Sequence, residues 1–251
     1  MIRFNIPLSH SFNICLSAMR KRIITLILIL FSFGISRAQI LTDISLMNIN
    51  DAAARDYGLI DFDNTDAYIG TPYSNPKFVL GSILRNDTVV FNLVALRYNA
   101  INDQLEIKET LSTPNQKIRN LKKSASLVAK IGETRFVFMP LEGSVSDGDF
   151  LEVIYQGTQV DVYKKHIKDV RYPVKASTSL TRDLPAKFTD KPLYFLVTKR
   201  QQFYQFPNSR KNKFKVFGGK EKLMKQYAKD EKLDINNEKH LIAIVSHFEK
   251  Q

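Results

Sequence analysis

Short runs of β-branched and aromatic residues, separated by turn residues, fill the middle of this chain. Residues 77–84 and 88–98 form two such runs, and Asn86-Asp87 stands between them as a turn. Val, Ile, Phe and Tyr are enriched in strands because their side chains pack well on a pleated surface. Strands at intervals of about 8–12 residues, with no helical pattern between them, predict an antiparallel meander, barrel or sandwich. Further runs lie at 135–139, 151–155 and 159–163.

One segment of this region alternates strictly between apolar and polar residues. Leu105 and Ile107 are interleaved with Gln104, Glu106 and Lys108. A period of two places successive side chains on opposite faces of a sheet. We therefore expect a strand here with one buried face and one solvated face.

Two connections shape the later part of the sheet. Gln156-Gly157 joins the runs 151–155 and 159–163, and we expect the glycine to supply the positive φ that a tight hairpin needs. Residues 169–191 are polar and contain prolines, which predicts a long loop or flap. Strands resume at 193–197 and around 203–206.

The hydrophobic period changes after Gly218-Gly219. Leu223, Tyr227 and Ala228 suit a short helix. A second helix is expected to begin near Glu238, since Asn236 or Asn237 is a good N-cap. One apolar stripe on this second helix must face the sheet; it consists of Leu241, Ile242, Val245 and Phe248. The predicted fold class is mainly β, an antiparallel meander/barrel or sandwich with a small C-terminal two-helix cap.

An apolar run near the start of the chain indicates export. Residues 23–35 carry no charge, residues 20–22 before them are basic, and Ser36-Arg37-Ala38 offers small residues before a cleavage ahead of Gln39. This is the pattern of a secretory signal peptide. The run holds 13 residues, whereas a membrane-spanning helix takes roughly 20. We expect translation to start at Met19, which gives the signal ordinary proportions.

Cysteine usage agrees with this prediction. The only cysteine, Cys15, precedes the apolar run, so the chain from Gln39 onward has no thiol. No cysteine follows the cleavage point to accept a lipid, which excludes a lipoprotein. We expect an exported protein of the periplasm or one associated with the outer membrane, with no transmembrane span after cleavage and no cofactor.

Basic residues are concentrated in the C-terminal quarter. The whole chain has a formal charge of +12. Residues 187–251 contain 15 basic and 7 acidic side chains, whereas the residues from Gln39 to 186 are close to neutral. Such asymmetry predicts contact with an anionic partner, or else a solvated basic face.

The strongest binding signal is the segment 199–220, in which basic residues are interleaved with aromatic ones. Basic side chains beside aromatic rings bind anionic groups and stack on planar or sugar rings. An export signal argues against nucleic acid and in favour of an anionic glycan, a lipopolysaccharide headgroup or an envelope protein. The alternative is a hairpin whose aromatic residues face the core while its lysines face water, although Phe217 breaks that alternation. The candidate contact residues are Lys199, Arg200, Arg210, Lys211, Lys213 and Lys215.

Asp61-Phe62-Asp63-Asn64-Thr65 matches the nucleophile loop of haloacid-dehalogenase-like phosphatases, in which Mg²⁺ assists an attacking aspartate. That loop must follow a parallel strand in an α/β fold, but here β-type sequence follows. Asp61, Asp63 and Asp66 are also weak candidates for a calcium site. An EF-hand counted from Asp61 lacks its glycine and its final glutamate. A solvated acidic turn is the simpler interpretation.

Histidine offers little support for a zinc site or a catalytic centre. After the leader, the sequence contains only His166, His240 and His247. No nucleophile elbow, P-loop or dinucleotide motif is present, and the sequence Gly143-Ser-Val-Ser-Asp-Gly fits a hairpin loop. We therefore expect no catalytic residues and no metal centre.

Four short motifs and a signal ending in Ala-Gln resemble those of a group of uncharacterised secreted proteins common in Bacteroidota. The resemblance covers most of the chain after the signal. It implies an exported β-rich fold with terminal helices and carries no activity to any residue. The motifs are Gly70-Thr71-Pro72-Tyr73, Leu96-Arg97-Tyr98-Asn99, Asp103-Gln104-Leu105-Glu106-Ile107 and Val162-Tyr163-Lys164-Lys165.

Together these patterns predict four segments: a signal peptide (1–38), an irregular N-terminal arm (39–76) that packs over the sheet, a β domain (77–217) and a helical cap (218–251). The expected function is non-enzymatic binding or structural association in the cell envelope through the basic C-terminal region. One alternative is a Mg²⁺-dependent hydrolase that uses Asp61 and Asp63. Another is a subunit of a larger envelope assembly whose exposed strand edges pair with partner strands.

Overall fold

The computed structural model describes residues 47–48, 60, 65–140, 148–178 and 180–251. The expected signal peptide, most of the expected N-terminal arm, Asp61, Asp63 and the turn after Gly143 lie outside these residues. One compact unit, Asp43–Gln251, contains every element described below. No helix in the described ranges is long and apolar enough to cross a membrane.

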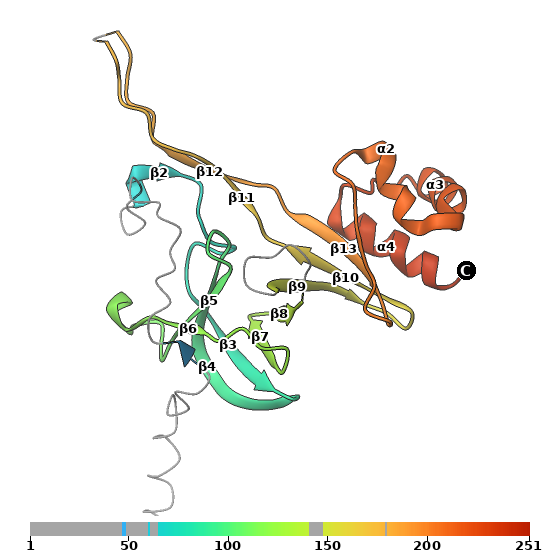
Figure 1. The fold of residues 1–251 in the computed structure, drawn as a ribbon, viewed down its shortest axis with the longest axis horizontal. Helices are drawn as coiled ribbons and strands as arrows, with labels where there is room; N and C mark the ends of the chain where they lie inside the picture. Colours follow the sequence, from blue (N-terminus) through green and yellow to red (C-terminus); the bar gives the residue numbers. More distant parts are fainter. Residues whose placement is uncertain (1–46, 49–59, 61–64, 141–147, 179) are drawn as a thin grey trace, which may run out of the picture. The chain divides into compact units, whose positions relative to one another are not determined.

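An antiparallel sheet of eleven strands dominates the described part of the chain (Figure 1). Neighbouring strands are mostly consecutive in the sequence, as in a meander. The mainly β prediction with C-terminal helices is therefore confirmed. The strands run in the order β1 (Met47–Asn48), β6 (Arg119–Leu121), β5 (Gln104–Lys108), β4 (Thr88–Asn99), β3 (Val79–Arg85), β7 (Leu127–Ile131), β8 (Thr134–Met139), β9 (Asp149–Gln156), β10 (Val160–Lys165), β13 (Leu193–Thr198) and β14 (Phe203–Gln205).

The β3–β4 hairpin shows why local sequence predicts this region well. Its turn residues Asn86 and Asp87 both have positive φ, the geometry of a turn that follows the twist of the two strands. Gly81 in β3 lies so close to the carbonyl of Lys130 in β7 that a Cβ would clash with it. Turn chemistry and a close backbone approach thus set the positions of three neighbouring strands.

The expected solvated face of β5 is wrong, because Glu106 and Lys108 are buried together with Leu105 and Ile107. The carboxylate of Glu106 accepts hydrogen bonds from Nε and Nη2 of Arg97 at 2.9 and 2.6 Å. These charges are tolerated below the surface because they are paired and hydrogen-bonded. Alternation alone gives no information about such pairing.

Residues from three of the resemblance motifs meet around Arg97. Its guanidinium carbon lies 3.5 Å from the ring centroid of Tyr73. The backbone N–H of Ala100 donates to the carbonyl of Pro72, so the Gly-Thr-Pro-Tyr turn is fastened to the end of β4. With Glu106 on the other side of Arg97, the conspicuous residues of these motifs stabilise one corner of the sheet.

The sheet curls strongly between β4 and β10. Four strands separate these two in the sheet order, and a flat sheet would place them roughly 24 Å apart. The ring of Tyr98 in β4 nevertheless lies 5.7 Å from the ring of His166, which directly follows β10. Phe136 of β8 contacts both rings. Aromatic packing on the concave face therefore accompanies the curl.

The predicted loop or flap over 169–191 is wrong at its two ends, where the chain pairs as strands, whereas the described residues between 172 and 185 lie outside any strand and carry one isolated bridge, Val174 with Leu184. The paired strands are β11 (Lys168–Arg171) and β12 (Ala186–Asp190). β12 also pairs in parallel with β2 (Tyr68–Ile69), which follows the short helix η3 (Thr65–Ala67). Tyr68 and Phe188 pack edge to face in a small core at this site. We call residues 168–191 the β-arm.

The C-terminal elements are α2 (Arg210–Lys213), η5 (Phe214–Lys220), α3 (Glu221–Asp230) and α4 (Glu238–Glu249), and we call residues 210–251 the helical cap. They lie beside β10 and β13 (Figure 1). Asn237 caps α4, because its side chain accepts from the N–H groups of Lys239 and His240, as the sequence predicts. Helical structure begins at Arg210, earlier than the expected Gly218.

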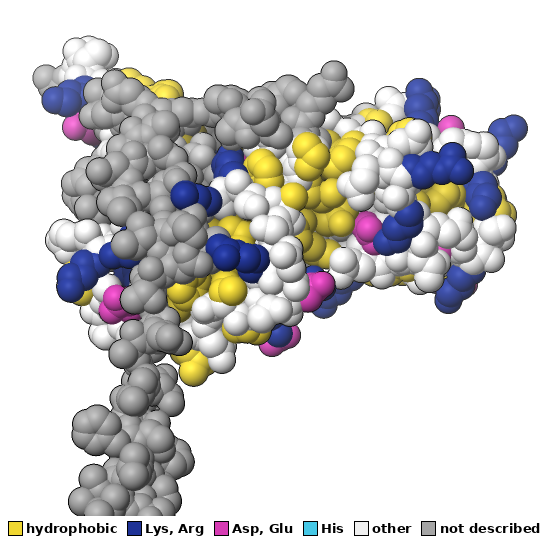
Figure 2. Space-filling model, turned by 60° about the horizontal axis from the view of Figure 1, so that its bottom comes forward, with side chains coloured by type: hydrophobic (Ala, Val, Ile, Leu, Met, Phe, Trp, Pro, Cys, Tyr) yellow, Lys and Arg dark blue, Asp and Glu magenta, His cyan; other side chains and the backbone are white. Residues whose placement is uncertain are grey.

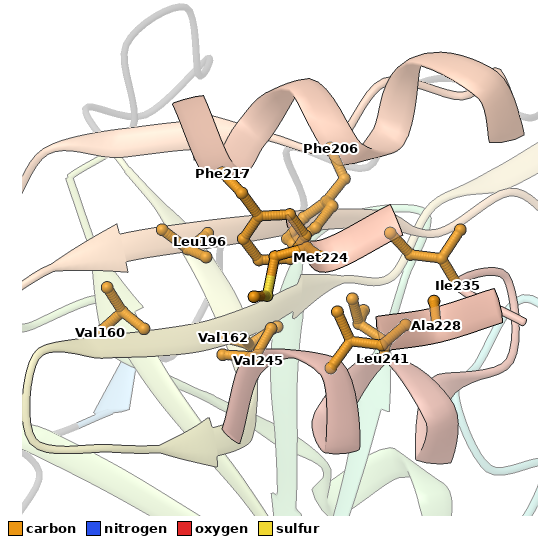
Figure 3. Close-up of a cluster of buried hydrophobic side chains, with 11 residues drawn as sticks. Val160, Val162, Leu196, Phe206, Phe217, Met224, Ala228, Ile235, Leu241 and Val245 are labelled. Carbon is orange, nitrogen blue, oxygen red and sulfur yellow. The ribbon is translucent and has the colours of Figure 1, made fainter. Parts of the chain in front are cut away.

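Apolar side chains from the cap and the sheet form one shared core. Met224 of α3 is fully buried and points into its centre (Figure 3). The sheet side is supplied by Val160, Val162 and Leu196. Since these residues alternate along β10 and β13, a single face of the sheet carries the cap. The other members of the core are Phe206, Phe217, Ala228, Ile235, Leu241, Ile244 and Val245.

Candidate functional site

The hairpin considered for the basic segment is wrong from Arg210 onward, where the chain is helical. Residues three apart share a face of a helical turn. Phe214 and Phe217 therefore both turn toward the cap core, with ring centroids 6.3 Å apart. The helical period explains why Phe217 does not fit a strand alternation.

Four of the six predicted basic residues lie on α2 and η5, and we call them the basic surface: Arg210, Lys211, Lys213 and Lys215. The side chain of Arg210 is 70% exposed, and its Nε lies 3.5 Å from a carboxylate oxygen of Asp234. Lys211 and Lys215 are exposed. Among the described residues, no carboxylate lies within ion-pairing distance of either lysine. Their charges are therefore available to a ligand in solution.

Lys213 differs from the other three because it is half-buried. Burial lowers the pKa of its ammonium group, and Asp234 opposes this shift. The Nζ atom lies 6.0 Å from the ring centroid of Tyr194 in β13, and the Nζ of Lys164 lies at the same distance from that ring. Lys213 therefore lies where the basic surface meets the sheet.

Lys199 and Arg200 do not belong to this surface. Nζ of Lys199 donates to both carboxylate oxygens of Asp161, at 2.7 and 2.8 Å. Asp161 stands between Val160 and Val162, which face the cap, so its side chain lies on the opposite face of the sheet. Arg200 is exposed in the turn between β13 and β14. The structure thus separates Lys199 and Arg200 from the other four predicted contact residues.

Lysines of α3 add to the basic character of the cap and were not among the predicted contact residues. Lys222 and Lys229 are exposed, while Lys225 forms an ion pair with Glu221 one turn earlier. Their spacing of three and seven residues places them on one helix face, and this signal is readable in the sequence. Figure 2 shows Lys and Arg side chains gathered at the right-hand end, where the cap lies.

Glu249 at the end of α4 fixes the cap to the β9–β10 turn. Its carboxylate accepts from the hydroxyl of Tyr155 at 2.6 Å, from the N–H of Gln159 at 2.7 Å and from the N–H of Val160 at 2.9 Å. Partial burial disfavours the charged form, but these hydrogen bonds outweigh it and lower the pKa of Glu249. We call this contact the Glu249 clamp.

Gly157 contributes to this turn for a reason that differs from the expected positive φ. Its φ is not among the positive values. Instead, a Cβ at position 157 would collide with the carboxylate of Glu249. The absence of a side chain therefore makes room for the clamp.

The other end of α4 is fixed by Glu238. Its Oε2 accepts from Nζ of Lys164 at 2.8 Å and from the hydroxyl of Tyr194 at 2.9 Å. Both partners lie in the sheet and are directly paired with each other. The helix carries a carboxylate contact to the sheet at each end, with the apolar core between them.

A row of polar side chains continues from Glu238 across the sheet. Lys164 of β10 pairs with Glu152 of β9, and Nε2 of His166 also lies within hydrogen-bond distance of that carboxylate. Burial disfavours the charged carboxylate, but the contacts with His166 and Lys164 lower the pKa of Glu152 overall. These partners are mutually satisfied, which indicates a stabilising network.

A second polar cluster surrounds Asp103 at the β4–β5 turn. The carboxylate accepts from the hydroxyl of Tyr98 at 2.7 Å and from the N–H of Phe150 at 3.0 Å, and it forms an ion pair with Lys123. Burial raises the pKa of Asp103 to about 6, against the opposing effect of Lys123. Burial also raises the pKa of Tyr98 well above its ordinary value. The cluster joins three parts of the sheet.

Asp66, His240 and His247, the other described candidates for a metal site, do not form a cluster. Asp66 is exposed in η3. Nδ1 of His240 accepts the N–H of Asp234, while His247 stacks on Tyr227 with ring centroids 3.7 Å apart. Within the described residues, no three His, Cys, Asp or Glu side chains lie close enough together to hold a metal ion. The hypothesis of a hydrolase centred on Asp61 and Asp63 stays untested, since both lie outside those residues.

Comparisons with known proteins add no relationship. No protein-family model, no curated protein and no solved structure matches this chain.

Proposed function

We propose that this chain is an exported, non-enzymatic protein of the cell envelope that binds an anionic partner through the basic surface of its helical cap. The observation that carries the proposal is the exposure of Lys211 and Lys215 and the lack of a described carboxylate near either ammonium group. Both are exposed, and neither has an ion-pair partner among the described residues, while Phe214 between them in sequence packs against the cap core. The positive charge therefore faces outward from an ordered surface.

The way the cap is held supports binding. Met224 and the core around it fix the inner face of the helices, and Glu238 and Glu249 tie both ends of α4 to the sheet. The backbone that carries Lys211 and Lys215 therefore has little freedom to lose when a ligand binds. Preorganised charges bind more tightly than charges on a flexible tail because less ordering entropy is lost.

The nature of the charges favours a partner with separate, strongly hydrated anionic groups. Lysine presents a compact ammonium group on a flexible stem and acts as a point charge, whereas arginine is suited to bidentate recognition. Sulfate, phosphate and carboxylate groups on a glycan meet this description, as does an acidic face of an envelope protein. Because the lysines are exposed, the binding should weaken as salt screens them.

The test is retention on a heparin column, used as a sulfated glycan probe. The chain from Gln39 is compared with a variant in which Arg210, Lys211 and Lys215 are changed to Glu. We expect the variant to elute at a clearly lower salt concentration, since its local charge changes by six units. All three side chains are exposed, so the fold should be retained.

A matched control reverses three exposed lysines of the β domain, Lys77, Lys117 and Lys130, with the same change in net charge. It should elute close to the wild-type chain if the basic surface is the contact. Equal shifts for the two variants would show that net charge alone governs retention and would refute the assignment. Cross-linking in the native envelope with the same pair of variants then distinguishes a glycan from an acidic protein.

A further inference from the structure

The outer half of the β-arm extends beyond its small core, and one isolated β-bridge joins its two sides there. Val174 and Leu184 exchange both backbone hydrogen bonds, at 2.9 and 2.8 Å, and so continue the register of β11 and β12. Their side chains are 54% and 43% exposed. Figure 1 shows this part of the hairpin continuing past β2. This pair of apolar side chains therefore lies in solvent although its backbone is hydrogen-bonded.

Leu180 at the tip of the β-arm is 98% exposed. Single exposed leucines are common on protein surfaces. This one differs because it stands at the end of a projecting hairpin, where an apolar surface can reach it without contacting the rest of the fold.

Thr178 and Thr181, which flank the tip, are hydrogen-bonded to each other. The N–H of Thr181 donates to the carbonyl of Thr178, and the N–H of Thr178 donates to the hydroxyl of Thr181. The Thr181 hydroxyl donates to the same carbonyl. Polar groups that are already satisfied cost much less to remove from water than free ones. These two threonines can therefore leave water at little cost when Leu180 does.

Two basic residues follow close behind the tip. Lys175 and Arg182 lie on opposite strands, and among the described residues neither has a carboxylate within ion-pairing distance. The nearby carboxylate of Asp183 accepts the backbone N–H of Ala176. Lys175 lies opposite Asp183 in the register of the hairpin, so at about 3.3 Å per residue the two cations stand roughly 7–10 Å behind Leu180. This is comparable with the distance between the acyl boundary and the phosphates of a bilayer.

We propose that the tip of the β-arm docks on an anionic lipid surface, with Leu180 in the acyl boundary and Lys175 and Arg182 at the lipid phosphates. Leu180 at the tip, two threonines that are bonded to each other, and two cations with no carboxylate partner among the described residues together match this partner. The arm carries a surplus of three basic residues, Lys and Arg at six positions against Asp at three, which complements an anionic leaflet. A protein pocket for the tip is the outcome that the experiment must exclude.

The first experiment uses the absence of tryptophan from this chain. A Leu180→Trp variant of the chain from Gln39, which contains the whole compact unit, is mixed with vesicles of phosphatidylcholine containing about a third phosphatidylglycerol. Tryptophan emission should shift to the blue as the indole enters the interface. A Leu111→Trp variant, at another exposed leucine in a different part of the fold, should show no shift. No shift at position 180 would overturn the proposal.

The second experiment measures sedimentation with the same vesicles. Leu180→Asp and the double variant Lys175→Glu with Arg182→Glu should each lower the partition coefficient by about ten-fold or more. Leu111→Asp is the control with the same chemical change as Leu180→Asp. Equal binding to vesicles of pure phosphatidylcholine would contradict the role of charge. Absence of the wild-type chain from both vesicle pellets would refute lipid binding and favour a protein partner.

This inference does not depend on the basic surface of the cap. The variant with Arg210, Lys211 and Lys215 changed to Glu should keep at least half of its vesicle binding. Loss of binding in that variant, with no loss in the Leu180→Asp variant, would place the lipid contact on the cap and overturn the proposal for the arm.

Discussion

The helical cap and the β-arm have similar charge but are held in different ways. Both carry more basic than acidic residues, and in both the basic residues are interleaved with apolar or aromatic ones. The cap packs on β10 and β13 through a shared core of eleven buried residues from both sides and through two carboxylate contacts. The β-arm has a small core only at its base, around Phe188, and its outer half is exposed on both faces.

This difference shows that composition does not distinguish a surface packed on a core, as in the cap, from one exposed on both faces, as in the outer β-arm. In the cap, aromatic residues such as Phe217 are buried in the core, and the basic residues remain at the surface. In the β-arm, Leu180 and Val174 have no core to enter, so apolar and basic side chains are both presented to a partner. We therefore expect mutations to affect the stability of the cap and the binding of the β-arm.

The largest effect on stability is expected for Met224→Ala. The side chain is fully buried at the centre of the cap core, and removing it leaves a cavity. The free energy of unfolding should fall by about 2–5 kcal/mol, as measured by urea denaturation of the chain from Gln39. A loss below about 1 kcal/mol would mean that the cap is loosely packed and would weaken the contrast with the β-arm.

An intermediate effect is expected for Glu249→Gln, which keeps the size of the side chain and removes the charge. The variant should lose about 1–2 kcal/mol at neutral pH, since hydrogen bonds to a charged acceptor are stronger than those to an amide. The pKa of Glu249 is lower in the folded chain than its ordinary 4.5. Its contribution is therefore complete above that value and is lost as the pH falls through the lowered pKa.

The pH dependence provides the check on this prediction. Thermal melts of wild type and Glu249→Gln should differ at pH 7 and converge toward pH 3. A constant difference over this range would show that the charge of Glu249 does not stabilise the clamp. Gly157→Ala should reproduce part of the loss at pH 7, because its Cβ displaces the same carboxylate.

The smallest effect on stability is expected in the outer half of the β-arm. Leu184→Ala removes a half-exposed side chain that contributes little to a core, so the free energy of unfolding should change by less than about 0.5 kcal/mol. Denaturation under the conditions used for Met224→Ala gives a direct comparison. A loss above about 1.5 kcal/mol would show that the outer arm is packed against other parts of the chain, contrary to the contrast drawn here.

Local patterns in the sequence identified much of the fold. The strands β3, β4, β8, β9, β10 and β13 and the two longer helices follow from side-chain period, turn residues and the Asn237 cap. Sequence reasoning failed where a tertiary partner decides the outcome. Glu106 is buried because Arg97 reaches it from β4, and the base of the β-arm pairs as the strands β11 and β12 although the sequence predicts a loop there.

The candidate site shows the same limit. The sequence located the excess of basic residues and the interleaved aromatic ones, since both are properties of neighbouring positions. It did not separate Lys199 from Lys211, because the carboxylate that engages Lys199 lies 38 residues earlier. The partners Tyr155 and Glu249 are 94 residues apart. Side-chain period and turn chemistry act over a few residues and determined the elements by themselves. The sharing of buried charges depends on which strands and helices become neighbours, and only the tertiary structure decided that.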